Sequence, residues 1–72
     1  MNKNSVLQLQ AIQAAKNGDW ETALNKNQEL LSLNQSDIGA LNRSAIAHLQ
    51  LNQEKEAKKL LETVISLDKS NA

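Results

Sequence analysis

Residues 11–23, AIQAAKNGDWETA, and residues 45–57, AIAHLQLNQEKEA, decide the fold of this chain. The second stretch begins 34 residues after the first, and Ala, Ile and Ala recur at its first, second and last positions. The same register extends outward to Leu7 and Leu41. A fixed period of this length, with small or apolar residues at the repeated positions, is typical of stacked repeat units.

Composition favours an all-α fold. The 72 residues include no proline and are rich in Leu, Ala, Gln, Glu and Lys, the residue types that lose least free energy on entering a helix. A chain of this size makes one domain at most, and it hides only about 60% of the surface that its unfolded form exposes. Because the chain has no cysteine, it has neither a disulfide nor a thiol for metal binding or nucleophilic chemistry.

Charge and hydropathy argue against two classes of partner. Eight basic residues balance eight acidic ones, so there is no broad positive field of the kind that nucleic acid or anionic lipid requires. No stretch approaches the roughly 20 apolar residues that span a bilayer. We therefore expect a cytoplasmic protein without a nucleic-acid or membrane partner.

Capping signals divide the first half of the chain into two helices. Ser5 and Gln8 form a capping box, which predicts the start of the first helix. That helix should end at the Asn17-Gly18 pair, since Gly tolerates the left-handed conformation that commonly closes a helix. Asp19 then caps a second helix over about residues 20–33.

The second half repeats this plan. Ser36 or Asp37 can cap a third helix, which should continue to Asn52, a residue able to adopt the left-handed form. A fourth helix should follow over about residues 53–67. Because the links between the helices are short, consecutive helices should be antiparallel.

A helical hairpin of 34 residues resembles the tetratricopeptide repeat family, in which a large residue is followed by a small one and the second helix contains an Ala. The resemblance covers nearly the whole chain, twice. The matching positions are Leu7, Gln10, Ala11, Ala14, Gly18, Ala23, Asn27, Leu30 and Leu33, then Leu41, Ser44, Ala45, His48, Asn52, Ala57, Leu61, Val64 and Leu67.

The resemblance implies two antiparallel hairpins, residues 4–37 and 38–71, which form one domain over 1–72 as a short right-handed solenoid. It also implies that the first helix of each hairpin lines a concave surface. A peptide or protein segment would bind there, with the apolar groups supplying affinity and the amides fixing register. The alternative is that the two isoleucines of this surface, Ile12 and Ile46, fill the crevice between neighbouring helices. The candidate groove residues are Gln8, Ile12, Asn42, Ile46 and Leu49.

Two polar residues lie within apolar stripes. An unpaired Asn27 amide would cost about 1–3 kcal/mol, so it needs a hydrogen-bond partner. In the family pattern its place is near that of His48, and we expect these two side chains to be hydrogen-bonded. His48 should otherwise be a core or boundary residue, because one His without Cys or clustered carboxylates makes no metal site.

The two ends of the chain differ. Val6, Gln10 and Gln13 occupy places where the third helix has small residues, and the polar pair Gln10 and Gln13 suits a solvent-facing end. The fourth helix keeps apolar residues that no later helix covers, so the rest of a longer parent protein, a homo-oligomer or a partner should cover them. This oligomer or partner face comprises Leu60, Leu61 and Ile65.

The function expected from these features is a non-catalytic module that binds a protein or peptide. The alternative is a structural element that self-associates through its fourth helix. No Cys nucleophile, phosphate-binding Gly loop or Ser, His and acid set at workable spacing is present, so we expect neither an enzyme nor a cofactor or metal site.

Overall fold

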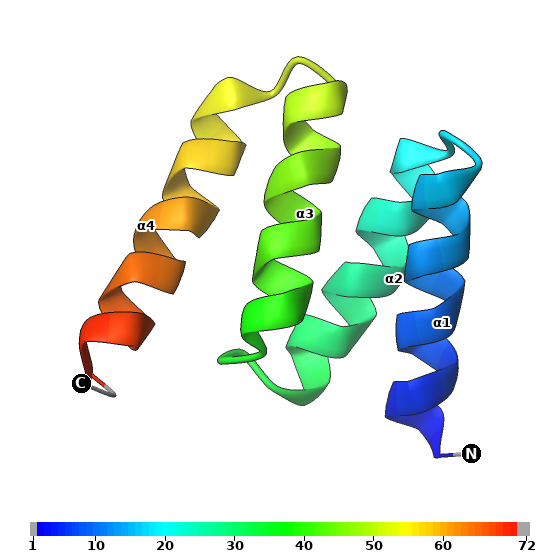
Figure 1. Cartoon of the computed structure of the whole chain (residues 1–72), viewed down its shortest axis with the longest axis horizontal. Helices are drawn as coiled ribbons and strands as arrows, with labels where there is room; N and C mark the ends of the chain where they lie inside the picture. The colour runs from blue at the N-terminus through cyan, green and yellow to red at the C-terminus, as the bar shows by residue number, and fades with distance from the viewer. Residues whose placement is uncertain (1, 71–72) are drawn as a thin grey trace.

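The computed structural model of the protein describes residues 2–70, with side chains through residue 68. It shows four α-helices and, within that range, no strand, which confirms the predicted all-α fold. Residue 71, the end of the second predicted unit, lies outside the described residues. The helices are α1 (Lys3–Lys16), α2 (Trp20–Leu33), α3 (Ile38–Gln50) and α4 (Glu54–Ser70) (Figure 1).

The N-cap of the first helix lies three residues earlier than predicted, at Asn2 instead of Ser5. The Oδ1 atom of Asn2 accepts a hydrogen bond from the Ser5 N–H at 2.8 Å. The predicted capping box of Ser5 and Gln8 is therefore wrong, because Ser5 already lies inside the first turn. Asn caps a helix as well as Ser does, since its side-chain oxygen reaches the same unpaired N–H groups.

Both hairpin turns close with the same backbone geometry. Gly18 has φ +74° and Asn52 has φ +62°, so both adopt the predicted left-handed conformation. In each turn the N–H of the next residue satisfies a carbonyl that the helix end leaves unpaired. These bonds run from Asp19 to Ala14 at 2.9 Å and from Gln53 to His48 at 2.7 Å.

Carboxylates cap the next two helices. Asp19 and Asp37 each accept a hydrogen bond from the N–H three residues later, at 3.3 and 3.1 Å. This confirms Asp19 and selects Asp37 over Ser36 as the cap of α3. The third helix ends at Gln50, two residues short of the prediction, and α4 continues past residue 67 to residue 70.

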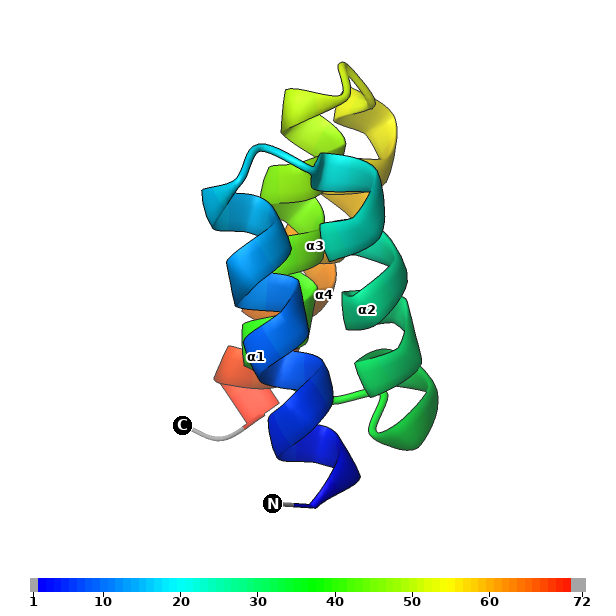
Figure 2. The ribbon, with the colours of Figure 1, turned by 90° about the vertical axis from the view of Figure 1, so that its right-hand side faces the viewer.

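Consecutive helices run antiparallel and pack side by side: α1 on α2, α2 on α3, and α3 on α4 (Figure 1). The molecule is a flat slab with extents of 32 × 32 × 17 Å. Turned to the narrow side, it shows α1 and α3 toward one broad face and α2 toward the other (Figure 2). The third helix has neighbours in sequence on both sides, whereas α1 and α4 each pack mainly on one.

Small side chains lie where the helices approach one another. Ala11 and Ala23, in the first hairpin, are 0% and 1% exposed, and Ala45 and Ala57 of the second are both 1% exposed. Helix backbones can approach closely where the side chains between them are no larger than a methyl group. All four alanines are therefore buried where the repeat pattern predicts close contact.

Beyond the alanine contacts, a small hydrophobic cluster links three helices. Leu7 of α1, Leu30 of α2 and Ala40 of α3 form one buried cluster, and Leu31 packs partly against it. Since few bulky residues are buried, many of the apolar side chains remain accessible to a partner.

Equivalent positions on α1 and α3 have different exposure. On α3 these positions pack toward α2 and are almost completely buried, whereas on α1 they are exposed, as predicted for a solvent-facing end. The buried residues are Ala40, Ser44 and Ala47, and their exposed counterparts 34 positions earlier are Val6, Gln10 and Gln13.

Candidate interaction surfaces

The five predicted groove residues lie on α1 and α3, the helices on the same side of the slab (Figure 2). Ile46 and Leu49 are 50% and 47% exposed, and both amide side chains, Gln8 and Asn42, are exposed. Ile12 is half-buried. The two isoleucines thus differ: Ile12 has the burial of a residue that partly fills a crevice, and Ile46 exposes about half of its surface to solvent.

Leu9 extends this apolar surface, although it was not among the predicted site residues. It is 48% exposed and lies one helical turn before Ile12, which puts both side chains on one side of α1. The spacing of three residues could have revealed it. The comparison of repeats obscured it, because the residue 34 positions later is Arg43. We call the surface formed by Gln8, Leu9, Ile12, Lys16, Asn42, Arg43, Ile46 and Leu49 the α1/α3 face.

The buried amide of Asn27 pairs with Arg43, so the predicted hydrogen bond to His48 is wrong. Its Oδ1 accepts from Arg43 Nε at 3.0 Å, and its Nδ2 donates to the Ala23 carbonyl at 2.9 Å. His48 Nδ1 instead lies 2.6 Å from Gln53 Oε1, at the turn before α4. Arg43 can form this bond because its long side chain reaches from a half-buried position of α3 to α2, a contact that repeat spacing alone does not reveal.

Gly39 makes room for the Arg43 guanidinium. A Cβ atom on Gly39 would lie 3.1 Å from Nη1 and 3.6 Å from Nη2 of Arg43, so the arginine lies close over the glycine backbone. Gly39 does not adopt the left-handed conformation, so a glycine is suited to this position because it has no side chain that would contact Arg43. Arg43 is consequently held between Asn27 on α2 and the first turn of α3.

Charge is divided unequally between the helices. None of the eight acidic residues lies in α1 or α3. These helices carry Lys3, Lys16 and Arg43, which together give a formal charge of +3. The acidic residues lie in α2, α4 and the caps Asp19 and Asp37. The two helices therefore carry positive charge that the overall balance conceals, and Asp37, the cap of α3, offsets part of it beside Arg43.

The predicted oligomer or partner face lies on α4. Leu61 and Ile65 are 41% and 55% exposed, and Leu60 is half-buried. The residues 34 positions before Leu61 and Ile65 are Asn27, which is 1% exposed, and Leu31, which packs against the core. The third helix covers this face on α2, and no described element covers it on α4.

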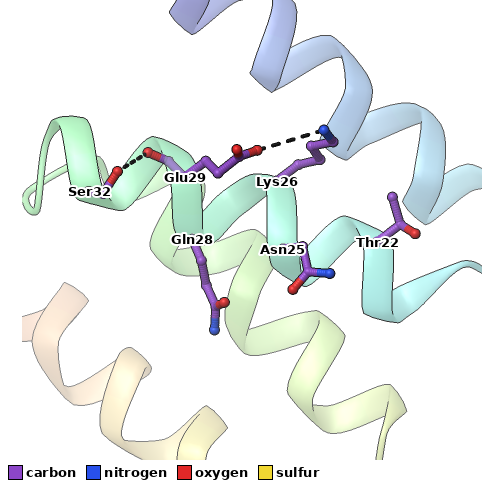
Figure 3. A pocket seen from close by; sticks show the side chains of 6 residues that line it. All are labelled: Thr22, Asn25, Lys26, Gln28, Glu29 and Ser32. Carbon is purple, nitrogen blue, oxygen red and sulfur yellow. Dashed lines mark hydrogen bonds and ion pairs between the residues drawn. The ribbon is translucent and has the colours of Figure 1, made fainter.

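A shallow hollow of about 520 Å³ follows α2 and does not coincide with the predicted groove (Figure 3). It is wide open, polar or charged residues line it, and it includes an ion pair between Lys26 and Glu29 at 3.7 Å. One helix supplies its lining, so the side chains do not converge on a ligand from several elements. The lining residues are Thr22, Asn25, Lys26, Gln28, Glu29 and Ser32.

The described part of the chain has neither a cluster of metal-ligating side chains nor a membrane-spanning helix. No three His, Cys, Asp or Glu side chains in it come together to form a metal site. None of its helices has the length and apolarity needed to cross a bilayer.

Comparison with known proteins gave no match: no family model matches the sequence, and no curated protein or solved structure matches it significantly.

Proposed function

We propose that this protein is a non-catalytic interaction module, which binds a peptide or protein segment on the α1/α3 face. The observation that carries the proposal is the exposure of Leu9, Ile46 and Leu49, each close to half, on two helices at the same side of the slab. Exposed apolar side chains that gather on one face, with polar residues around them, mark interaction sites. In this proposal the protein acts in the cytoplasm, where it binds another protein.

Membership of the tetratricopeptide repeat family is part of this proposal. It is supported by the equivalent turns at Gly18 and Asn52 and by the buried alanines 34 residues apart. The two hairpins, residues 4–37 and 38–71, would then be the repeats of a short right-handed solenoid whose first helices form the binding side.

The experiment replaces Ile46 and Leu49 together by Gln and measures binding to an array of short peptides. Gln is polar, uncharged and favourable in helices, so the change removes apolar surface with little effect on folding. The matched control is Leu33→Gln, because Leu33 is also 50% exposed but lies at the end of α2. Binding should be lost in the double variant and kept in the control. Equal binding by both variants would eliminate this face as the site.

A second function is favoured by the exposure of Leu61 and Ile65 on α4. Burying this face in a two-fold dimer would remove it from water. Light scattering after size exclusion should then give twice the 7.9 kDa of one chain. Replacing both residues by Gln should restore that single-chain mass, and a wild-type protein that stays monomeric at high concentration would refute self-association.

A further inference from the structure

We propose that the segment bound by the α1/α3 face is acidic as well as apolar, and that its Asp or Glu carboxylates pair with Arg43 and Lys16. This inference rests on the proposed function and adds the chemistry of the partner. It comes from the hydrogen bond that holds Arg43, from the space above Gly39, and from the absence of acidic residues in both helices that form the face.

Asn27 holds the arginine in one orientation. A guanidinium has five N–H groups, and Asn27 accepts from the one on Nε. The four on Nη1 and Nη2 have no hydrogen-bond partner among the described residues. These are the groups that form a two-pronged contact with a carboxylate. Because Asn27 is 1% exposed and its own amide is tied to Ala23, the arginine loses less freedom when a ligand arrives.

The carboxylate of Asp37 lies near this arginine without forming an ion pair with it. The Oδ1 of Asp37 borders the same space, 3.4 Å from where a Cβ of Gly39 would lie, and it accepts from the Ala40 N–H at 3.1 Å. No ion pair joins Asp37 to Arg43 in the described structure, where the one such pair is between Lys26 and Glu29 on α2. The Nη1 and Nη2 groups of Arg43 therefore have no direct ion-pair partner, although the nearby Asp37 carboxylate offsets part of the positive charge.

Cations and apolar side chains are neighbours on both helices. On α3, Arg43 precedes Ile46 by three residues, and on α1, Ile12 precedes Lys16 by four, so each pair shares one side of its helix. A partner that alternates apolar and acidic side chains would satisfy both kinds of contact. A nucleic acid fits poorly, because the chain's one aromatic residue, Trp20, lies on α2 and two cations are few for a phosphate backbone.

The test uses three sets of peptides of about twelve residues, acetylated and amidated so that no terminal charge contributes. All carry leucines at the same spacing, and the other positions are Glu and Asp, Gln, or Lys. Fluorescence anisotropy should show the tightest binding for the acidic set, with the advantage over the Gln set shrinking as salt is raised. Ile46→Gln should weaken both sets, which would place them on the same face.

Charge variants then locate the contacts. Lys16→Gln should weaken the acidic set about threefold and leave the Gln set unchanged. Lys55→Gln is the matched control, since it removes an exposed lysine from α4 instead. Arg43→Lys keeps the charge but removes the two-pronged contact, so the acidic set should lose about tenfold. Asn27 acts as a positioning residue: Asn27→Ala should weaken the acidic set alone, whereas a loss of structure would weaken both sets.

Different failures have different meanings. If acidic and Gln peptides bind equally, the inference about charge is overturned and the proposed function stands. If no set binds, both are refuted. Tighter binding of a uridine oligonucleotide than of any peptide, or binding that requires a free terminal carboxylate, would also overturn the inference. Should Arg43→Lys fail to fold, the Lys16→Gln comparison and the salt dependence still decide the matter.

Discussion

Replacing Arg43 by Met should lower the free energy of unfolding by about 2 kcal/mol. The change leaves the Oδ1 of Asn27 without a partner, and an unsatisfied buried acceptor costs about 1–3 kcal/mol. Asn27 is 1% exposed, so water cannot replace the lost donor. Met retains an unbranched apolar side chain, which keeps most of the contact that the arginine methylenes make.

The same replacement should cost much less when Asn27 is already Ala. Asn27→Ala alone should cost about 1 kcal/mol. It removes the buried acceptor together with its hydrogen bond, and the Arg43 Nε–H that is left can bond to water. With no acceptor left to strand, adding Arg43→Met should change stability by under about 0.5 kcal/mol. The double-mutant cycle should therefore give a coupling energy of about 1.5 kcal/mol, well above the error of additive sites.

Urea unfolding followed by far-ultraviolet circular dichroism measures these differences. A domain of this length is expected to have about 4–11 kcal/mol of total stability, so a loss of 2 kcal/mol is resolved. The control cycle pairs Asn27→Ala with His48→Ala, and these two changes should be additive. Additive effects of Arg43→Met and Asn27→Ala, or coupling of Asn27 to His48 instead, would refute the assignment of the buried amide to the arginine.

Three further predictions concern packing, turns and the open end. Ala57→Leu should cost about 1–3 kcal/mol in urea unfolding, because the α3–α4 contact has no space for the larger side chain; an unchanged midpoint would contradict close packing there. Gly18→Ala should cost about 1–2 kcal/mol and lower the thermal midpoint, since φ is +74° although no atom lies within 4 Å of the new Cβ. Ile65→Lys should reduce self-association, measured as a smaller rise of the sedimentation coefficient with protein concentration. Helicity should stay unchanged, because Ile65 is 55% exposed. A loss of helicity would show that the Ile65 side chain packs inside the protein.

Regular structure could largely be predicted from the sequence, and the errors are local. The second helix has the predicted bounds, and Gly18 and Asn52 end their helices as their left-handed tendency requires. The first helix begins at Lys3 because Asn2 competes successfully with Ser5 for the cap position. Which of two nearby polar residues becomes the cap depends on the backbone conformation at each, and residue spacing does not specify that conformation.

The candidate surfaces were predicted only in part. The spacing placed Ile46 and Leu49 on a shared helix side, but their exposure depends on which helices pack behind them. Leu9 was missed for a different reason: the residue 34 positions later is Arg43, so the comparison of repeats showed no apolar match. The division of charge was hidden by the balanced total, since it appears only once the helices are assigned to two sides of the slab.

The sequence by itself determined the four helices and the burial of Ala23 and Ala57, because caps, turns and methyl-sized contact points depend on residues near one another in the chain. The tertiary structure alone decided the partner of Asn27. An arginine side chain spans several ångströms and can turn in more than one direction, so its contact was settled only when α3 had packed on α2 and Gly39 had left it room.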